Sequence, residues 1–303
     1  MENILETQNL GKCYGKNNVL NNVNIHIPVH SIYGLIGKNG AGKTTLMRIL
    51  CNLQQPSTGN YFLYGVKNTE KSIVRYRRKI GAIIELPAVY TNMTAKENLI
   101  VQSKLISNKK ETNIDELLKI TGLNGLDNKK VKNFSLGMRQ RLGIAIALIG
   151  NPELIILDEP INGLDPQGII DLRKLIVYLN KNRNITFLIS SHYLDELSKV
   201  ATNFGFIDKG NLIEEISRKK LDEKCKHYIQ INVNNQKNCI KYLEQNNIPY
   251  EVIDKENINI YKDINVSNLI IDLSKYDCIV NKFQEREENL EDYFMNLIGG
   301  EKW

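Results

Sequence analysis

Long hydrophobic runs are absent from this sequence of 303 residues. No apolar stretch approaches the roughly 20 residues that a membrane-spanning helix needs. The first ten residues, MENILETQNL, also lack the basic start and apolar centre of a secretory signal peptide. We therefore expect a protein that remains in the cytoplasm.

Cysteine and proline are also scarce, with five and seven residues. The cysteines show no paired spacing of the kind that marks a disulfide framework or a zinc site. They are Cys13, Cys51, Cys225, Cys239 and Cys278. In a cytoplasmic protein we expect them to be reduced structural thiols.

The net charge of +6 is unevenly distributed along the chain. Residues 1–215 carry 27 Lys and Arg against 19 Asp and Glu, whereas residues 216–303 carry 13 against 15. A basic half is compatible with nucleic acid, an anionic membrane surface or phosphate ligands. The sequence has no dense block of Lys and Arg interleaved with aromatic residues, so nucleic acid is not an expected partner.

The stretch from Ile32 to Leu50 has the order strand, glycine-rich loop, helix. Its central GKNGAGKT fills each fixed position of the phosphate-binding loop, or Walker A, pattern. In such loops backbone N–H groups and the helix N-terminus surround a phosphate chain. Lys43 is expected to reach the β- and γ-phosphates, and the Thr44 hydroxyl to hold Mg²⁺. A glycine-containing surface turn is the alternative, which the flanking strand and helix disfavour. The predicted nucleotide-binding residues are Gly37, Lys38, Asn39, Gly40, Ala41, Gly42, Lys43, Thr44 and Thr45.

Two carboxylates follow a second apolar run, Leu154 to Leu157. Ligands of parallel sheets collect at the carboxyl ends of the strands. Asp158 is then placed to orient Mg²⁺ or its waters, and Glu159 to act as a base for an attacking water. A strand that ends in solvated acids is the alternative, and the phosphate-binding loop upstream makes it the weaker one.

Strand and helix signals alternate over the first two thirds of the chain, which predicts a parallel sheet covered by helices. Alternating apolar residues from Val19 to Ile27 indicate an antiparallel region ahead of the phosphate-binding loop. Residues of about 86–150 have helical patterns and predict an insertion. We therefore predict an α/β P-loop NTPase core over residues 1–215, with an antiparallel β subdomain and a helical insertion.

A charged segment, residues 216–226, is predicted to be a linker because it is poor in strand formers. Residues 227–303 then read strand, helix, strand, strand, helix, strand. This order predicts a small α+β domain of the ferredoxin-like βαββαβ type. A terminal helix from Leu290 to Ile298 is expected after it, and this part of the chain shows no motif for chemistry.

Residues 1 to about 215 resemble the ATP-binding subunit of an ABC transporter. Tyr14 fits the aromatic residue that stacks on adenine in that family, and His192, in Ser190-Ser191-His192, fits its switch histidine. The other markers are the phosphate-binding loop, Phe134-Ser135-Leu136-Gly137-Met138 at the signature loop (usually LSGGQ), and Asn162-Gly163-Leu164-Asp165-Pro166 at the D-loop. Their order over some 200 residues makes the resemblance specific.

The resemblance implies that two such subunits pair head to tail around two ATP molecules, with Mg²⁺. Each site would combine the phosphate-binding loop of one subunit with Ser135, Leu136, Gly137 and Met138 of the other. Glu159 and His192 would act on the attacking water and the γ-phosphate. Closure of the pair would move an integral-membrane permease, so the subunit is expected at the inner face of the cell membrane.

One position departs from the common family pattern. The loop after Ile80–Ile84 normally begins with a glutamine that touches Mg²⁺ and relays to the permease, and here Glu85 stands in its place. This variant, and the ending Asn289 to Phe294, resemble the branch that exports lantibiotic- and bacitracin-like peptide antibiotics for self-protection. A neutral change in a generic drug or ion exporter is the alternative. Leu136 and Met138 also differ from the usual signature residues, which concerns the rate and not ATP binding.

Other nucleotide-binding classes fit less well. A P-loop kinase or GTPase has no place for the signature loop and the D-loop. Soluble ABC ATPases that act on ribosomes usually carry two ATP modules, and this chain has one. Those that act on DNA usually carry a long coiled coil before the signature loop, for which residues 93–133 are too short.

Overall fold

The computed structural model describes residues 2–106, 112–224, 227–262, 264–287 and 290–297. The chain forms two compact units, residues 1–218 and 219–303. The predicted linker, residues 216–226, is ordered over residues 216–224, which the structure describes. It contains the end of strand β11 (Asn211–Ser217) and helix α8 (Arg218–Lys224), whose Leu221 is buried. The charged composition of this segment did not predict a helix, and Leu221 is the one buried side chain of α8.

The first unit is organised around a sheet of six strands in the order β11-β10-β4-β9-β8-β7. All neighbouring pairs except β10 and β11 are parallel. The strands are β4 (Ile32–Ile36), β7 (Ile80–Ile83), β8 (Leu154–Leu157), β9 (Thr186–Ser191), β10 (Asn203–Asp208) and β11. Strands β4, β8 and β9 are buried along their whole length, which explains why the sequences of β4 and β8 are continuous apolar runs rather than alternating ones.

An antiparallel sheet packs against one side of this core. Its strands are β1 (Asn3–Tyr14), β2 (Asn17–Val23), β3 (His26–Pro28), β5 (Thr58–Leu63) and β6 (Val66–Lys67). The long strand β1 pairs with β2, β3 and β5. Sequence patterning did not identify β1, because register shifts along it break the alternation of apolar and polar residues.

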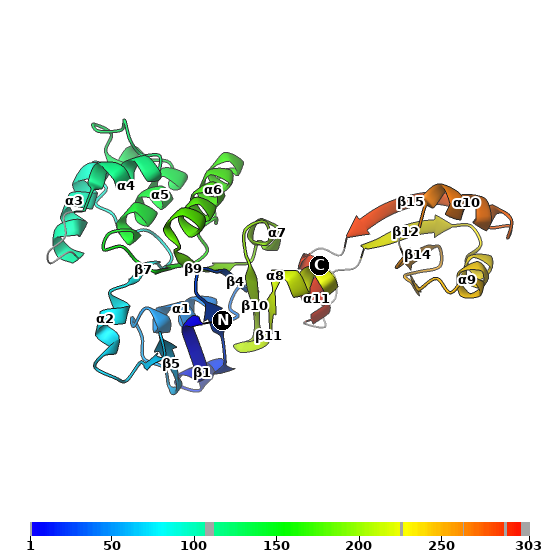
Figure 1. Cartoon of the computed structure of the whole chain (residues 1–303), viewed down its shortest axis with the longest axis horizontal. Coiled ribbons are helices and arrows are strands. Elements are labelled where there is room, and N and C mark those ends of the chain that lie inside the picture. Colours follow the sequence, from blue (N-terminus) through cyan, green and yellow to red (C-terminus); the bar gives the residue numbers. More distant parts are fainter. Residues whose placement is uncertain (1, 107–111, 225–226, 263, 288–289, 298–303) are drawn as a thin grey trace. The chain divides into compact units, whose positions relative to one another are not determined.

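The helices of the first unit fall into a core group and an inserted group. The core group is α1 (Lys43–Leu50), α2 (Ile73–Arg77), α6 (Pro166–Arg183) and α7 (Leu194–Ser198). The inserted group is α3 (Ala95–Ile106), α4 (Ile114–Ile120), the 3-10 turn η1 (Val131–Asn133) and α5 (Leu136–Ala147). Figure 1 shows α3, α4 and α5 on the opposite side of β7 and β9 from β1 and β5. The predicted helical insertion is therefore present.

The second unit has the predicted order of elements. They are β12 (His227–Val233), α9 (Gln236–Gln245), β13 (Tyr250–Val252), β14 (Asn257–Ile260), α10 (Val266–Ser274), β15 (Val280–Glu287) and α11 (Leu290–Leu297). The sheet order β13-β14-β12-β15, antiparallel throughout, is that of a ferredoxin-like fold. Apolar residues of β12, β14, α9 and α10 form one core, so both helices cover the same face. Ile298, the predicted end of the terminal helix, lies outside the described residues.

The predicted fold class is thus confirmed for both units. Within the described part of the chain, no helix is long and apolar enough to cross a membrane.

Candidate functional site

The phosphate-binding loop joins the buried end of β4 to the first turn of α1. Gly42, the N-cap of α1, has φ 105°, a left-handed conformation that L side chains rarely adopt. At Gly37 a Cβ atom would lie 2.4 Å from the Ile207 carbonyl oxygen, so only glycine fits. At both positions a side chain would therefore be strained or would clash.

Lys43 is almost fully buried at the base of this loop, with 5 % of its surface exposed. Its Nζ donates hydrogen bonds to the carbonyl oxygens of Gly37 (2.6 Å) and Lys38 (3.2 Å). The ammonium group is therefore held within the loop by backbone carbonyls. A cation in this position can contact the phosphates that a loop of this kind surrounds.

Asp158 lies at the carboxyl end of β8, is 2 % exposed, and meets two hydroxyl groups. Thr44 Oγ1 donates to its Oδ2 at 2.8 Å, and Ser190 Oγ donates to its Oδ1 at 2.6 Å. Hydroxyl and carboxylate oxygens are the ligands that Mg²⁺ prefers in proteins. The oxygen atoms of Thr44 and Asp158 therefore fit a magnesium ion at the edge of the loop.

Glu159 stands between the lysine and the histidine. One oxygen, Oε1, lies 3.1 Å from Lys43 Nζ, and the other, Oε2, lies 2.8 Å from His192 Nδ1. Oε1 is buried. Within the described part of the chain, it has the ion-pair contact with Lys43 but no hydrogen bond of favourable geometry. A carboxylate oxygen with an unused lone pair can act as a general base once a water molecule reaches it.

Ser190 was not identified from the sequence as a functional residue. Besides its bond to Asp158, its Oγ accepts a hydrogen bond from the Glu159 N–H at 2.8 Å. From the neighbouring strand β9 it therefore positions the Asp158 carboxylate and the Glu159 backbone. The signal was present in Ser190-Ser191-His192, but nothing in one strand's sequence shows which residues of another strand lie opposite.

The signature loop and the D-loop lie against each other in the first unit. Ser135 is the N-cap of α5, where its Oγ accepts from the Met138 N–H at 3.2 Å. A Cβ atom on Gly163 would lie 3.1 Å from Leu136 Cδ2, so the unusual leucine of the signature loop packs on the D-loop. Asp165 caps α6 through the Gly168 N–H at 3.2 Å. The two loops are thus fixed at the starts of two helices.

Tyr14 and Glu85, the predicted base-stacking and coupling residues, are both partly exposed. Tyr14 is 45 % exposed at the end of β1, and its hydroxyl donates to the Gln54 side chain. Glu85 has a left-handed backbone (φ 65°) and forms an ion pair with Arg48, in the last turn of α1. Arg48 was not singled out in the sequence, and the structure adds it to the site as the partner of Glu85.

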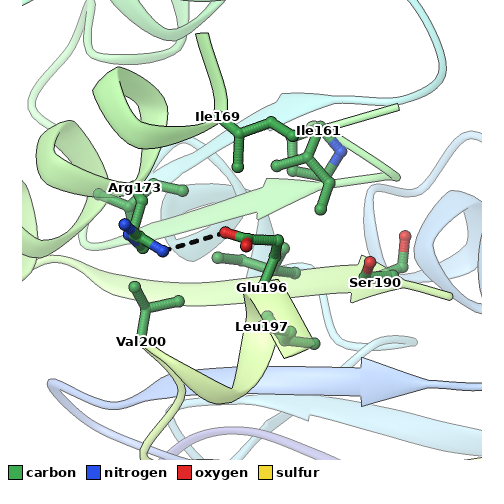
Figure 2. A pocket seen from close by; sticks show the side chains of 11 residues that line it. Ile161, Ile169, Arg173, Ser190, Glu196, Leu197 and Val200 are labelled. Carbon is green, nitrogen blue, oxygen red and sulfur yellow. Dashed lines mark hydrogen bonds and ion pairs between the residues drawn. The ribbon is translucent and has the colours of Figure 1, made fainter. Parts of the chain in front are cut away.

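A small cavity of about 30 Å³ lies between β9, α6 and α7, with Ser190 and Ser191 among its lining residues (Figure 2). Its volume is that of about one water molecule, so it is not a nucleotide site. Across it Arg173 of α6 pairs with Glu196 of α7 at 3.0 Å. The pair joins the helix that follows the D-loop to the helix that follows His192.

Comparison with known proteins agrees with this geometry. A protein-family model described as ABC transporter matches residues 20–162. The chain is 42% identical over 303 residues to the bacitracin transport ATP-binding protein BcrA of Bacillus licheniformis, covering 99% of each chain. The chain belongs to the ABC transporter family. This confirms the resemblance that the motifs indicate. The alignment with BcrA, unlike the family model, includes both units.

Two further relatives extend the comparison. The ABC protein is 47% identical over 212 residues to the lantibiotic transport ATP-binding protein SrtF of Streptococcus pyogenes, covering 70% of this chain and 90% of SrtF. The solved structure of cbiO1 from Clostridium perfringens, part of an ABC transporter complex, superposes with a TM-score of 0.65 at 27% identity, covering 73% of this chain and 91% of cbiO1. Membership of this family makes the chain an ATP-binding protein and an ATP hydrolase.

Proposed function

We propose that this ABC ATPase powers the export of a peptide antibiotic through a separate integral-membrane permease, at the inner face of the cell membrane. The observation that carries the proposal is the similarity to BcrA over 99% of both chains, which includes the second unit. The similarity to SrtF, and Glu85 at the start of the coupling loop, support the same substrate class.

In the proposed cycle, the loop from Gly37 to Thr45 binds the ATP phosphates and Tyr14 stacks on the base. Thr44, Asp158 and Glu85 would hold Mg²⁺, which neutralises phosphate charge when bound. Lys43 forms an ion pair with Glu159, and the phosphates of ATP would compete with that carboxylate for the lysine. ATP binding would therefore release Glu159 from the lysine.

Once released, the Glu159 carboxylate can accept a proton from water at Oε1. His192 Nδ1, bonded to the other oxygen, keeps the carboxylate oriented. The proposed composite site is completed by Ser135, Leu136, Gly137 and Met138 of a second ATP-binding subunit. The N-terminus of α5 suits a phosphate there, because a helix N-terminus attracts anions. The D-loop, Asn162 to Asp165, would lie at the same subunit boundary.

The Arg48–Glu85 ion pair suggests how Glu85 could differ from a glutamine. Both side chains are more than one third exposed, so the pair itself contributes little stability. A charged residue at this place would instead select a basic contact on the permease, or release Arg48 when the permease binds. Glu85→Gln is expected to weaken resistance.

The experiment is a resistance assay in the host from which the gene has been deleted. Complementation with the wild-type gene should restore the minimal inhibitory concentration of bacitracin or of a lantibiotic, and Glu159→Gln should not. Ethidium efflux serves as the comparison, because a generic drug exporter would change it. Restored ethidium efflux with unchanged peptide sensitivity would contradict peptide export and favour the generic exporter. The protein should also sediment with membranes only when the permease is present.

A further inference from the structure

The loop from Glu85 to Thr94 connects β7 to α3 and carries exposed apolar side chains. Leu86 is 74 % exposed and Tyr90 is 48 % exposed. The loop is nevertheless anchored, because the first turn of α3 places Asn98 beneath it with none of its surface exposed. The outer side of the loop is thus open to a partner while its inner side is fixed.

The carboxamide of Asn98 holds the loop backbone by three hydrogen bonds. Its Oδ1 accepts from the Tyr90 N–H at 2.7 Å, and its Nδ2 donates to the carbonyl oxygens of Tyr90 (3.0 Å) and Thr94 (2.8 Å). Both amide hydrogens and the oxygen are therefore used. A buried polar group satisfied in this way specifies one backbone arrangement, since any other leaves it unpaired.

The start of α3 has its own, separate support. Thr94 and Glu97 form a capping box, in which the Thr94 N–H donates to Glu97 Oε2 at 2.7 Å and the Glu97 N–H donates to Thr94 Oγ1 at 3.2 Å. The helix end does not need Asn98 to be capped. The function of Asn98 is therefore to hold Tyr90 and not to begin the helix.

The loop that Asn98 holds is paired in turn with the segment that leads to the signature loop. The Lys132 N–H donates to the Thr91 carbonyl at 2.8 Å, and the Val131 N–H donates to the Met93 carbonyl at 2.9 Å. Thr94 and Lys130 complete an antiparallel bridge. Two segments nearly forty residues apart in the sequence are thus joined by backbone hydrogen bonds.

From this pair the chain reaches Ser135 within three residues. Val131 and Phe134 are buried, at 0 % and 3 % exposed, so the segment is anchored in the helical insertion. The Arg139 guanidinium donates to the Phe134 carbonyl at 3.1 Å, which ties the residue before Ser135 to α5. The backbone position of Ser135 therefore depends on the loop that carries Tyr90.

We propose that Asn98 is a positioning residue that transmits displacement of the Tyr90 loop to signature-loop Ser135. The proposal rests on the proposed function in one respect, namely that Ser135 completes the ATP site of a second subunit. The sequence of contacts is Tyr90 to Asn98, the loop backbone to residues 130–132, and Phe134 to Ser135. Because each step is a hydrogen bond or a buried contact, a partner that shifts the Tyr90 loop also shifts Ser135.

The test compares Asn98→Ala with Asn180→Ala, both in the full chain carrying Glu159→Gln. Asn180 is a matched control, because its Nδ2 also joins two backbone carbonyls, those of His30 (3.0 Å) and Ile185 (2.9 Å), away from the signature loop. Light scattering measures ATP-driven dimer formation. Asn98→Ala should weaken it about ten-fold, and Asn180→Ala should not. Nucleotide affinity of the monomer should change less than about two-fold in either, since Lys43 and Thr44 are untouched.

Hydrogen exchange of the monomer gives a second measurement that does not depend on dimer formation. In Asn98→Ala the amides of Val131 and Lys132 should exchange faster, whereas Asn180→Ala should leave them unchanged. If Asn98→Ala does not fold, Asn98→Ser keeps one hydroxyl and should show the same changes to a smaller extent.

Equal dimer formation by Asn98→Ala and the parent, or equal losses in Asn98→Ala and Asn180→Ala, would overturn the proposal and leave Asn98 a structural clamp. Unchanged exchange at Val131 and Lys132 would overturn it as well. A parent that never dimerises with ATP would instead refute the composite site of the proposed function, and the exchange experiment would still decide the contact between the loop and residues 130–132.

Discussion

Replacement of Glu159 by glutamine is expected to tighten ATP binding as well as to stop hydrolysis. The Glu159 carboxylate lies 3.1 Å from Lys43 Nζ, in a site where the two side chains are 19 % and 5 % exposed. Phosphate must replace this carboxylate beside the lysine. Glu159→Gln removes the competing anion and leaves the lysine with its two carbonyl partners only.

The size of the effect follows from this distance. At an effective dielectric constant of about 20, two unit charges 3.1 Å apart attract by about 5 kcal/mol before desolvation is counted. Desolvation offsets most of that attraction, so we expect a net difference of about 1.4 kcal/mol, which is ten-fold in Kd. Loss of the proposed general base should meanwhile lower kcat by about 10² to 10⁴.

Isothermal titration with a non-hydrolysable ATP analogue, at protein concentrations that keep the chain monomeric, measures the affinity. Glu196→Gln is the matched control, since it breaks the Arg173 ion pair outside the phosphate-binding loop. Its Kd should stay within about two-fold of the wild type. An unchanged or higher Kd for Glu159→Gln would show that the lysine contact does not compete with phosphate, and would refute this prediction.

Two further predictions concern Ser190 and the second unit. Ser190→Ala should lower ATP hydrolysis by about 10- to 100-fold, because Asp158 and the Glu159 N–H each lose a partner; Ser191→Ala, assayed beside it, should have the smaller effect. Backbone N–H groups of Glu256 and Asn257, with the Asn257 side chain, hold the pKa of Asp254 below its usual value of 3.8. A lowered pKa gives stability that is present above the unfolded value and lost as the pH falls through the folded value. By calorimetry of the full chain, the stability advantage of wild type over Asp254→Asn should therefore shrink below about pH 4, and an advantage independent of pH would refute this origin.

The fold was largely readable from the sequence where local signals were strong. Strand β8 has the predicted bounds, and the second unit has the predicted order of elements, because apolar runs and helical periodicity report burial directly. The phosphate-binding loop was readable for another reason, since its glycines and Lys43 are close together in the chain. Strand β1 was not, because its irregular register hides the alternation.

What the sequence by itself determined is therefore the chemistry available at each motif and the order of the elements. Only the tertiary structure decided which of these groups meet. It placed Glu159 against Lys43, Ser190 against Asp158, and Arg48 against Glu85. It also gave Asn98 its contact with Tyr90. Such pairs join residues far apart in the chain, and their distances depend on how strands and helices pack, which no local pattern encodes.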